Sequence, residues 1–347
     1  MSKQVYERCF LAQGTDAMNL FKFILKVCKK VYQKIAMGNS YGIFFPEDIG
    51  LTPEQTSDVI IKLLSSDKPC MIARFGSSEF QAMQNCLAVE SQNYSILKYI
   101  RGEQFQWWWN ERTIQDIQQC SGFFPANPQT ISKFTKLMLK DVTELDLLAL
   151  WFGKEKQLPL PSNCKFIHLL MLEPYWSSHP WTNVLKDKKV VVVHPFAELI
   201  EYQYINHRNE LFDNPDILPS FNLRTVKAVQ SLGGENNDFK DWFEALQWME
   251  NEIDKEDYDV CLIGCGAYGF PLAAHCKRNG KKAIHMGGAL QLLFGIKGKR
   301  WENPSYARNW HMKPEDFYLK MLSHKNWVRP DEFRTRNSSQ IEGGCYW

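Results

Sequence analysis

Several features that would narrow the function of this chain are missing from its sequence. Its 10 cysteines are scattered and include no Cys-x-x-Cys pair, so a zinc site built from closely spaced thiolates is not expected. No apolar run reaches the length of a membrane-spanning helix. The first residues include Lys3, Glu7 and Arg8 with no apolar stretch behind them, which is unlike a secretory signal peptide. We therefore expect a cytoplasmic protein with reduced thiols.

An excess of charge of one sign is missing as well. The formal net charge is only +2, so the chain has no general attraction for polyanions and no nucleic-acid partner is expected. Internal repeats and low-complexity tracts are also missing. By contrast, aromatic residues are abundant at 14%, with 12 tryptophans. Their flat faces suit stacking on a carbohydrate or a nucleobase, although packing in a core is the more frequent use of tryptophan.

Apolar runs of strand length alternate with helical patterns from residue 51 onwards. Strands are expected at 70–73, 145–151, 166–171, 189–193, 226–229, 260–263 and 283–286. Helices are expected at 53–64, at 107–119, 197–206, 239–253 and 271–278, and after a cap at Ser77. The four consecutive valines at 190–193 are typical of a strand buried on both faces. The pattern predicts an α/β protein with a Rossmann-like open, mostly parallel sheet and helices on both faces.

The first 50 residues are expected to form an N-terminal amphipathic helical extension ahead of a Rossmann-like domain at 51–347. Apolar residues recur at helical spacing from Leu20 to Ile35. Five lysines occupy much of the opposite side, at positions 22, 26, 29, 30 and 34. Two interpretations stay open. Residues 18–37 can lie on an anionic membrane at its inner face, or the helix can pack on the core with its lysines in water.

The segment from Tyr258 to Trp301 has the pattern of a phosphate-binding α/β unit. A strand, a glycine turn, a helix, a second strand and a second glycine turn follow one another. Glycines let the backbone approach an anion closely, and a following helix directs its unpaired N–H groups at it. The phosphate-binding candidates here are Gly264, Gly266, Ala267, Tyr268, Gly269, His285, Gly287, Gly288 and Gln291. The basic candidates Lys297, Lys299 and Arg300 follow, as a diphosphate would require.

The same segment lacks the carboxylate that dinucleotide-binding enzymes place after the second strand. In this chain that strand continues into His285, Met286 and two glycines. This argues against a nucleotide-dependent reductase. A methyltransferase is also disfavoured, because S-adenosylmethionine has no phosphate for these residues to bind. A tight strand-to-helix connection remains the structural alternative for the glycines.

Two further strand ends carry chemically unusual residues. Arg74, Gly76, Ser77 and Glu79 follow the strand at 70–73. Arg74, Gly76 and Ser77 are candidates for donor binding, and Glu79 for a metal ligand or a catalytic carboxylate. As the alternative, a glutamate in a first helical turn complements the helix dipole. Because the carboxyl ends of parallel strands meet at one edge of a sheet, we expect one shared cleft.

Two other residues are candidates for a catalytic base. His194 ends the valine strand and would act as a base or hydrogen-bond a sugar hydroxyl. A histidine satisfied by a backbone carbonyl is the alternative. Glu173 is a carboxylate close to another predicted strand end. The sequence does not rank Glu79, His194 and Glu173 against each other.

Four segments together resemble glycosyltransferases of the GT-D fold, which are bacterial enzymes of polysaccharide and glycoprotein assembly. They are Arg-Phe-Gly-Ser-Ser-Glu at 74–79, His-Pro-Phe at 194–196, Gly-Ala-Tyr-Gly-Phe-Pro-Leu-Ala at 266–273, and Gly-Gly-Ala-Leu-Gln-Leu-Leu-Phe-Gly-Ile-Lys-Gly-Lys-Arg-Trp at 287–301. The segments 326–330 and 342–347 look like the same branch. The resemblance runs from about residue 50 to the end and leaves the N-terminal helix outside it.

The resemblance implies a nucleotide-sugar donor, commonly UDP-linked, and a glycan or lipid-linked acceptor in cell-surface polysaccharide assembly. It also implies a divalent metal, Mn²⁺ or Mg²⁺, held in such enzymes by Asp-x-Glu after the strand. Here Ser77 stands at the position of the aspartate and only Glu79 remains. A hydroxyl and one carboxylate still ligate such an ion when phosphates and waters complete its shell. A catalytically silent relative that kept the fold is the alternative.

Overall fold

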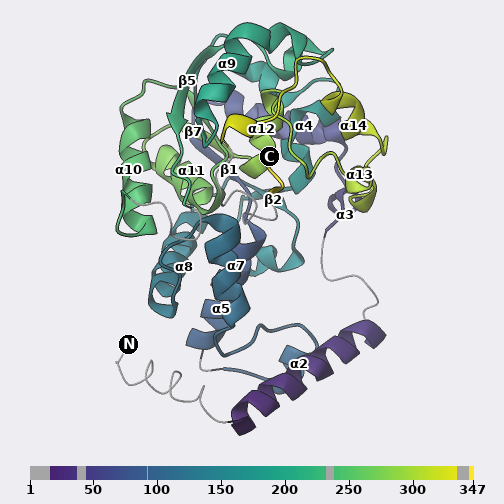
Figure 1. The fold of residues 1–347 in the computed structure, drawn as a ribbon, viewed down its shortest axis with the longest axis vertical. Coiled ribbons are helices and arrows are strands. Elements are labelled where there is room, and N and C mark those ends of the chain that lie inside the picture. The colour runs from purple at the N-terminus through teal and green to yellow at the C-terminus, as the bar shows by residue number, and fades with distance from the viewer. Residues whose placement is uncertain (1–15, 37–43, 92, 232–237, 334–343) are drawn as a thin grey trace.

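The computed structural model describes residues 16–36, 44–91, 93–231, 238–333 and 344–347 (Figure 1). Within them, seven strands form one sheet in the order β3-β2-β1-β7-β6-β4-β5, and all neighbouring pairs are parallel. The strands are β1 (Cys70–Ala73), β2 (Leu147–Leu150), β3 (Lys165–His168), β4 (Lys189–His194), β5 (Asn222–Lys227), β6 (Val260–Ile263) and β7 (Lys282–His285). The expected α/β class with a Rossmann-like open sheet is confirmed.

Helices cover both faces of the sheet, each over its own hydrophobic core. The first face carries α5 (Ser77–Glu90), α7 (Glu111–Ser121), α8 (Pro128–Val142), α10 (Trp242–Asp254) and α11 (Gly269–Arg278). The second face carries α4 (Pro53–Ser65), α9 (Ala197–His207), α12 (Leu290–Leu293), α13 (Tyr306–Asn309) and α14 (Phe317–Leu322). Side chains of a strand alternate between faces, so Val191 and Val193 enter the first core and Val190 and Val192 the second. The valine strand is therefore buried on both sides, as predicted.

The chain leaves neighbouring central strands toward opposite faces. β1 continues into α5 on the first face, whereas its neighbour β7 continues into α12 on the second. β6 and β4 repeat this arrangement, with α11 on the first face and α9 on the second. Such divergent connections open a crevice at the carboxyl ends of the strands. The topology therefore puts a ligand site beyond β1, β7, β6 and β4.

Some predicted boundaries differ from the structure. The strand expected at 226–229 begins earlier, because β5 pairs with β4 from Asn222 onwards. The helix expected from Trp107 begins only at Glu111, where the side chain of Asn110 accepts a hydrogen bond from the N–H of Arg112. Trp107 and the residues next to it pack against Tyr99 instead.

The cap expected at Ser77 is also corrected. Gly76 is the N-cap of α5, and Ser77 is its first helical residue. A glycine at this position supplies no side-chain acceptor, so the first N–H groups of α5 stay available for another partner. This matters because the start of α5 lies at the carboxyl end of β1.

The N-terminal helix exists as α2 (Asp16–Ala36), which contacts α6 (Ile96–Ile100) at one end of the molecule (Figure 1). Of the two interpretations left open by the sequence, the structure gives little support to packing on a core, because only Leu25 of the described side chains of α2 is buried and most of its apolar side chains are exposed. Residues 1–15 and 37–43 of the predicted extension lie outside the described residues. No helix that the structure describes has the length and hydropathy to cross a bilayer.

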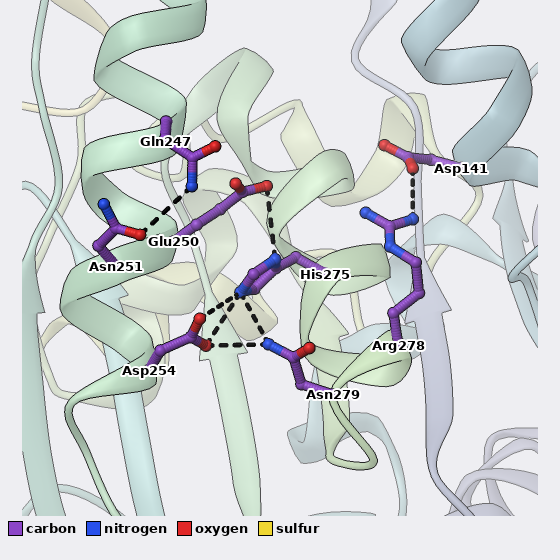
Figure 2. A network of polar contacts seen from close by, with 8 residues as sticks. All are labelled: Asp141, Gln247, Glu250, Asn251, Asp254, His275, Arg278 and Asn279. Carbon is purple, nitrogen blue, oxygen red and sulfur yellow. Dashed lines mark hydrogen bonds and ion pairs between the residues drawn. The ribbon is translucent and has the colours of Figure 1, made fainter.

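A polar network connects α8, α10 and α11 on the first face (Figure 2). The His275 ring is 2.9 Å from Oδ1 of Asp254 and 3.6 Å from Oε1 of Glu250. Arg278 donates from Nη1 to Oδ1 of the fully buried Asp141 at 2.6 Å. None of the eight residues drawn in Figure 2 lines the cavity at the strand ends. The network therefore holds the helices in place and is separate from the site.

Candidate functional site

A cavity of about 380 Å³ lies at the carboxyl ends of the strands. Residues that follow β1, β4, β6 and β7 form most of its wall, and residues 229–231 after β5 add to it. Tyr346 and Trp347 close another part of the wall. The three strand ends that stand out in the sequence therefore meet in one cavity, where the sheet topology puts a ligand site.

The predicted site residues divide into two groups. The cavity is lined by Arg74, Gly76, Ser77, Glu79, His194, Gly264, Gly266, Tyr268, His285, Gly287, Gly288, Gln291 and Arg300. Ala267, Gly269, Glu173, Lys297 and Lys299 are not among the lining residues. Of the predicted basic cluster at 297–300, only Arg300 reaches the cavity.

Arg74 is the basic residue at the crevice between β1 and β7. Its guanidinium carbon lies 5.3 Å from the centre of the Trp151 ring, and a Cβ atom on Gly287 would be 3.5 Å from that carbon. Its Nε is buried and has no hydrogen-bond partner among the described residues. Burial lowers the pKa of Arg74, and the charge of Glu79 acts in the opposite direction. A half-buried guanidinium whose Nε has no partner among the described residues is suited to a carboxylate or a phosphate.

Arg300 is the second guanidinium in the cavity wall. Its Nη2 is 3.0 Å from Sγ of Cys345, and its guanidinium carbon is 4.9 Å from the centre of the Tyr346 ring. A Cβ on Gly288 would meet that ring at 2.0 Å, so only a glycine lets Tyr346 lie over this turn. The C-terminal residues thus position Arg300 against the second glycine turn, a contact that connects residues far apart in the sequence.

Glu79 is the one carboxylate among the described residues that line the cavity, and it is 6% exposed. Ser78 donates from Oγ to Oε2 of Glu79 at 2.9 Å and also contacts the hydroxyl of Ser121. A Cβ on Gly76 would lie 2.0 Å from the same Oε2, so the carboxylate occupies the space that the glycine leaves. Glu79 is therefore held in place and faces the site from the first turn of α5.

His194 is neutral in this environment. Burial lowers its pKa to about 3, and its Nδ1 accepts the N–H of Phe196 at 3.0 Å. The proton of the neutral ring is then on Nε2, which makes the ring a hydrogen-bond donor toward a ligand. The low pKa makes His194 a weak base at neutral pH, so a donor role suits it better than proton abstraction.

His285 is buried beneath the first turn of α11. Burial and then the charge of Arg74 lower its pKa to about 3. Its Nδ1 is 3.4 Å from the carbonyl oxygen of Ile263, and a Cβ on Gly269 would lie 2.1 Å from the ring. Gly269 is therefore required for packing this ring and does not itself line the cavity.

Glu173 lies behind the cavity wall rather than in it. Tyr318 donates its hydroxyl to Oε2 at 2.6 Å, and Trp176 donates its indole N–H to the same oxygen at 3.2 Å. Burial raises the pKa of Glu173 to about 7, and these donors act in the opposite direction. The carboxyl group interacts electrostatically with Tyr306, which does line the cavity. Its contacts are those of a structural group.

Gln291 reaches the cavity but orders the chain around it. Its Nε2 donates to the carbonyls of Lys297 at 2.8 Å, Tyr346 at 3.1 Å and Ile296 at 3.3 Å. Its Oε1 is buried and has no partner among the described residues. The side chain thus joins the 296–297 segment to the C-terminal residues, and that contact is structural.

An aromatic wall faces the polar side of the cavity. Trp151, Tyr306, Trp310, Tyr346 and Trp347 all line it. Trp301, next to Arg300 in the sequence, is buried and does not line the cavity. The sequence gives no signal for Trp151 and Trp310, nor for Cys120 and Ser121, which lie in the last turn of α7.

The residues of the cavity do not fit a resident divalent metal ion. Glu79 and the Ser77 hydroxyl are the expected ligands, and the described residues contain no group of three or more His, Cys, Asp or Glu side chains that would hold a metal. Two guanidiniums in the same wall already supply positive charge. Binding of Mn²⁺ or Mg²⁺ would depend on oxygen atoms supplied by a ligand.

The comparisons with known proteins give no family. No protein-family model, no curated protein and no solved structure matches this chain. The resemblance of its motifs to GT-D-fold glycosyltransferases therefore stays a prediction.

Proposed function

We propose that this protein is a glycosyltransferase that uses a nucleoside-diphosphate sugar, UDP-linked by the family resemblance. The acceptor would be a glycan or a lipid-linked sugar in cell-surface polysaccharide assembly. The observation that carries the proposal is Arg74, whose guanidinium lines the cavity together with Arg300, while Glu79 is the one carboxylate among the described lining residues. The buried Nε of Arg74 without a partner among the described residues supports an anionic ligand.

The backbone around the two guanidiniums supports a diphosphate. Gly266 has a φ of +58° and Gly287 a φ of +67°, a conformation that glycine adopts without strain. The turn at Gly266 leads into α11, and the turn at Gly76 into α5. The first N–H groups of α5 have no side-chain cap and lie at the end of β1, where a diphosphate would accept hydrogen bonds from them. At α11 a short 3-10 turn (Gly266–Tyr268) comes first, and the N–H groups of Tyr268 and Gly269 already donate to the carbonyls of Cys265 and Gly266.

The aromatic wall supports a sugar nucleotide over a free diphosphate. Trp151, Trp310 and Tyr306 offer flat apolar surface on which a nucleobase or a sugar ring would stack. The neutral His194 would add a donor for a sugar or ribose hydroxyl.

The proposed reaction exchanges one bond at the anomeric carbon for another. The bond from this carbon to the diphosphate oxygen breaks, and its electron pair leaves with the diphosphate. Arg74 and Arg300 stabilise that negative charge. The acceptor oxygen bonds to the anomeric carbon as its proton passes to a base. Glu79 is our candidate, because it is the carboxylate that reaches the cavity among the described residues.

Donor binding is tested by titrating UDP into the protein by calorimetry, with and without Mn²⁺. We expect micromolar affinity that Arg74→Gln weakens on the order of 10-fold to 100-fold, since a hydrogen bond to a charged group contributes about 1.5–3 kcal/mol. Arg112→Gln is the matched control, because that side chain is 86% exposed, pairs with Asp116 and does not line the cavity. Equal affinities of Arg74→Gln and the unmodified protein for UDP would overturn the assignment of the phosphate site.

Catalysis is tested separately through Glu79. Glu79→Gln should lower sugar transfer or donor hydrolysis at least roughly 100-fold and leave UDP affinity within a few-fold, since it removes a proton acceptor and not a phosphate ligand. Glu198→Gln is the control, because this exposed carboxylate pairs with Lys227 at 2.6 Å and does not line the cavity. An unmodified protein that binds UDP but turns over no donor with any acceptor would favour the silent relative.

A further inference from the structure

The exposed side of α2 is apolar over most of the helix. Its outward-facing apolar residues are Leu20, Phe21, Phe23, Ile24, Val27, Val31, Tyr32 and Ile35. Their exposed fractions run from 37% at Tyr32 to 80% at Ile35. A contiguous apolar face of this extent is uncommon on a monomeric soluble protein and marks an interaction surface.

The opposite side of α2 attaches it to the rest of the protein. Leu25 is buried, and Nζ of Lys29 lies 4.5 Å from the centre of the Tyr99 ring in α6. Lys22 approaches the Trp108 ring at 6.0 Å. Burial lowers the pKa of Lys29 to about 8 and also lowers the pKa of Lys22. Because these contacts fix the orientation of the helix about its axis, the apolar face is turned outward.

The neighbouring helix extends the same kind of surface. In and just before α6, the side chains of Tyr94, Ile96 and Leu97 are 58%, 41% and 65% exposed. Lys98 and Arg101 are exposed beside them. α2 and α6 are in contact, so their apolar and basic side chains form one region of the surface. Figure 1 shows this region at the end of the molecule away from the sheet.

The charges of this region indicate what covers it. Lys26, Lys30 and Lys34 are exposed and follow one another at successive helical turns, along one flank of the apolar face. Residues 18–36 and 93–101 contain no aspartate and no glutamate. A second copy of α2 would bring lysines against lysines, which is unfavourable. An anionic lipid surface would pair with them.

We propose that α2 and α6 form a docking surface for an anionic lipid bilayer. α2 lies in the plane of the interface, its apolar face enters the boundary between headgroups and acyl chains, and its lysines contact lipid phosphates and carboxylates. The proposal rests on α2 and α6 alone and is independent of the donor-binding site.

Vesicle flotation tests the proposal with the full-length protein. Vesicles of phosphatidylcholine with phosphatidylserine should carry the protein to the top of the gradient. Vesicles of pure phosphatidylcholine should carry much less of the protein there. Replacing Lys26, Lys30 and Lys34 together by glutamine should weaken binding on the order of 100-fold, since each lysine contributes about 1 kcal/mol near an anionic surface. Raising the salt concentration should also weaken the binding of the unmodified protein to anionic vesicles.

The apolar part is tested by Val27→Asp combined with Val31→Asp, which should abolish flotation. Both side chains are more than 40% exposed, so the fold should tolerate the change. Ile205→Asp is the matched control, because Ile205 is 75% exposed on α9 and should leave flotation unchanged. UDP binding should be equal in all variants.

Three outcomes would overturn the proposal. The protein fails to float with anionic vesicles, the valine variant floats as well as the unmodified chain, or the chain is a dimer in light scattering that the valine variant dissociates without any vesicle binding. The last result would assign the apolar face to a second copy of this chain.

Discussion

The guanidinium groups of Arg278 and Arg74 both pack against other side chains of the protein, but the partners of the two groups differ. Arg278, in the last turn of α11, donates to the fully buried Asp141 and belongs to the network in Figure 2. Arg74, at the end of β1, contacts the face of Trp151 and leaves its buried Nε without a partner among the described residues. The pair of Arg278 and Asp141 holds two helices together, although Oδ2 of Asp141 is also buried without a partner among the described residues. The buried donor of Arg74 instead belongs to a residue that lines the cavity, where a ligand can accept from it.

Breaking the ion pair of Arg278 and Asp141 should have the largest effect on stability. Arg278→Met leaves Asp141 buried without its cation, which typically costs about 3 kcal/mol or more. The loss is expected in urea unfolding at neutral pH, with UDP affinity unchanged. Burial raises the pKa of Asp141 to about 6 even with Arg278 present, so acid should reduce the loss by protonating the carboxyl group. Adding Asp141→Asn to Arg278→Met should recover part of the lost stability. A double variant no more stable than Arg278→Met would show that the loss does not come from the buried charge of Asp141.

Glu173 represents a third arrangement, a buried carboxyl group that receives only neutral donors in the described contacts. Burial raises its pKa from 4.5 to about 7. Between these values the unfolded chain releases the proton while the folded chain keeps it, so the unmodified protein loses stability as pH rises from about 5 to 7. Glu173→Gln removes this titration.

We therefore expect the stability of Glu173→Gln relative to the unmodified protein to rise between pH 5 and pH 8, on the order of 2 kcal/mol. Unfolding in urea at the two pH values measures it. Glu201→Gln, at an exposed position on α9, is the control that should show no such change. A difference between Glu173→Gln and the unmodified chain that is independent of pH would show that Glu173 is ionised throughout.

Arg74 should behave in the opposite way to Arg278. Arg74→Met removes a charge with an unpaired buried nitrogen, so the free energy of unfolding without ligand should fall by less than about 1 kcal/mol or rise. The stabilisation that added UDP gives the unmodified protein should be lost. Thermal unfolding with and without UDP separates the two effects. A large destabilisation without ligand would make Arg74 a structural residue like Arg278.

The smallest effects are expected at the lysines that the sequence grouped with Arg300. Lys297→Gln and Lys299→Gln should leave UDP affinity within about twofold, because neither side chain lines the cavity. By comparison, Arg300→Gln should lower the affinity for UDP about 10-fold. Calorimetry of the three variants measures the difference, and equal losses in all of them would place the diphosphate outside the cavity wall.

Most of the sheet could be predicted because its strands are continuous apolar runs. Val260–Ile263 and Cys70–Ala73 match their expected limits, and the four valines lie in a strand buried on both sides. The strand at 222–227 was displaced in the prediction because it lies at the edge of the sheet and only Val226 in it is buried. An edge strand is defined by pairing with β4, which periodicity does not reveal.

The candidate site was predictable where a glycine turn or a polar residue follows a strand directly. Arg74, His194 and Gly264 were found in this way. Trp310 and Ser121 were not, since they come from a loop and a helix end that only the tertiary fold brings to the strand ends. The same limit explains Lys299, which is next to Arg300 in the sequence but does not line the cavity.

The sequence by itself determined the class of fold and the strand ends that carry chemistry, because both depend on residues that are neighbours along the chain. The tertiary structure decided which of those residues share a cavity, which arginine keeps unused donors, and which side of α2 faces outward. These properties depend on contacts between distant segments, such as Tyr346 over Gly288 and Lys29 over Tyr99. Burial and pairing are set by such contacts, and they separate a binding residue from a structural one.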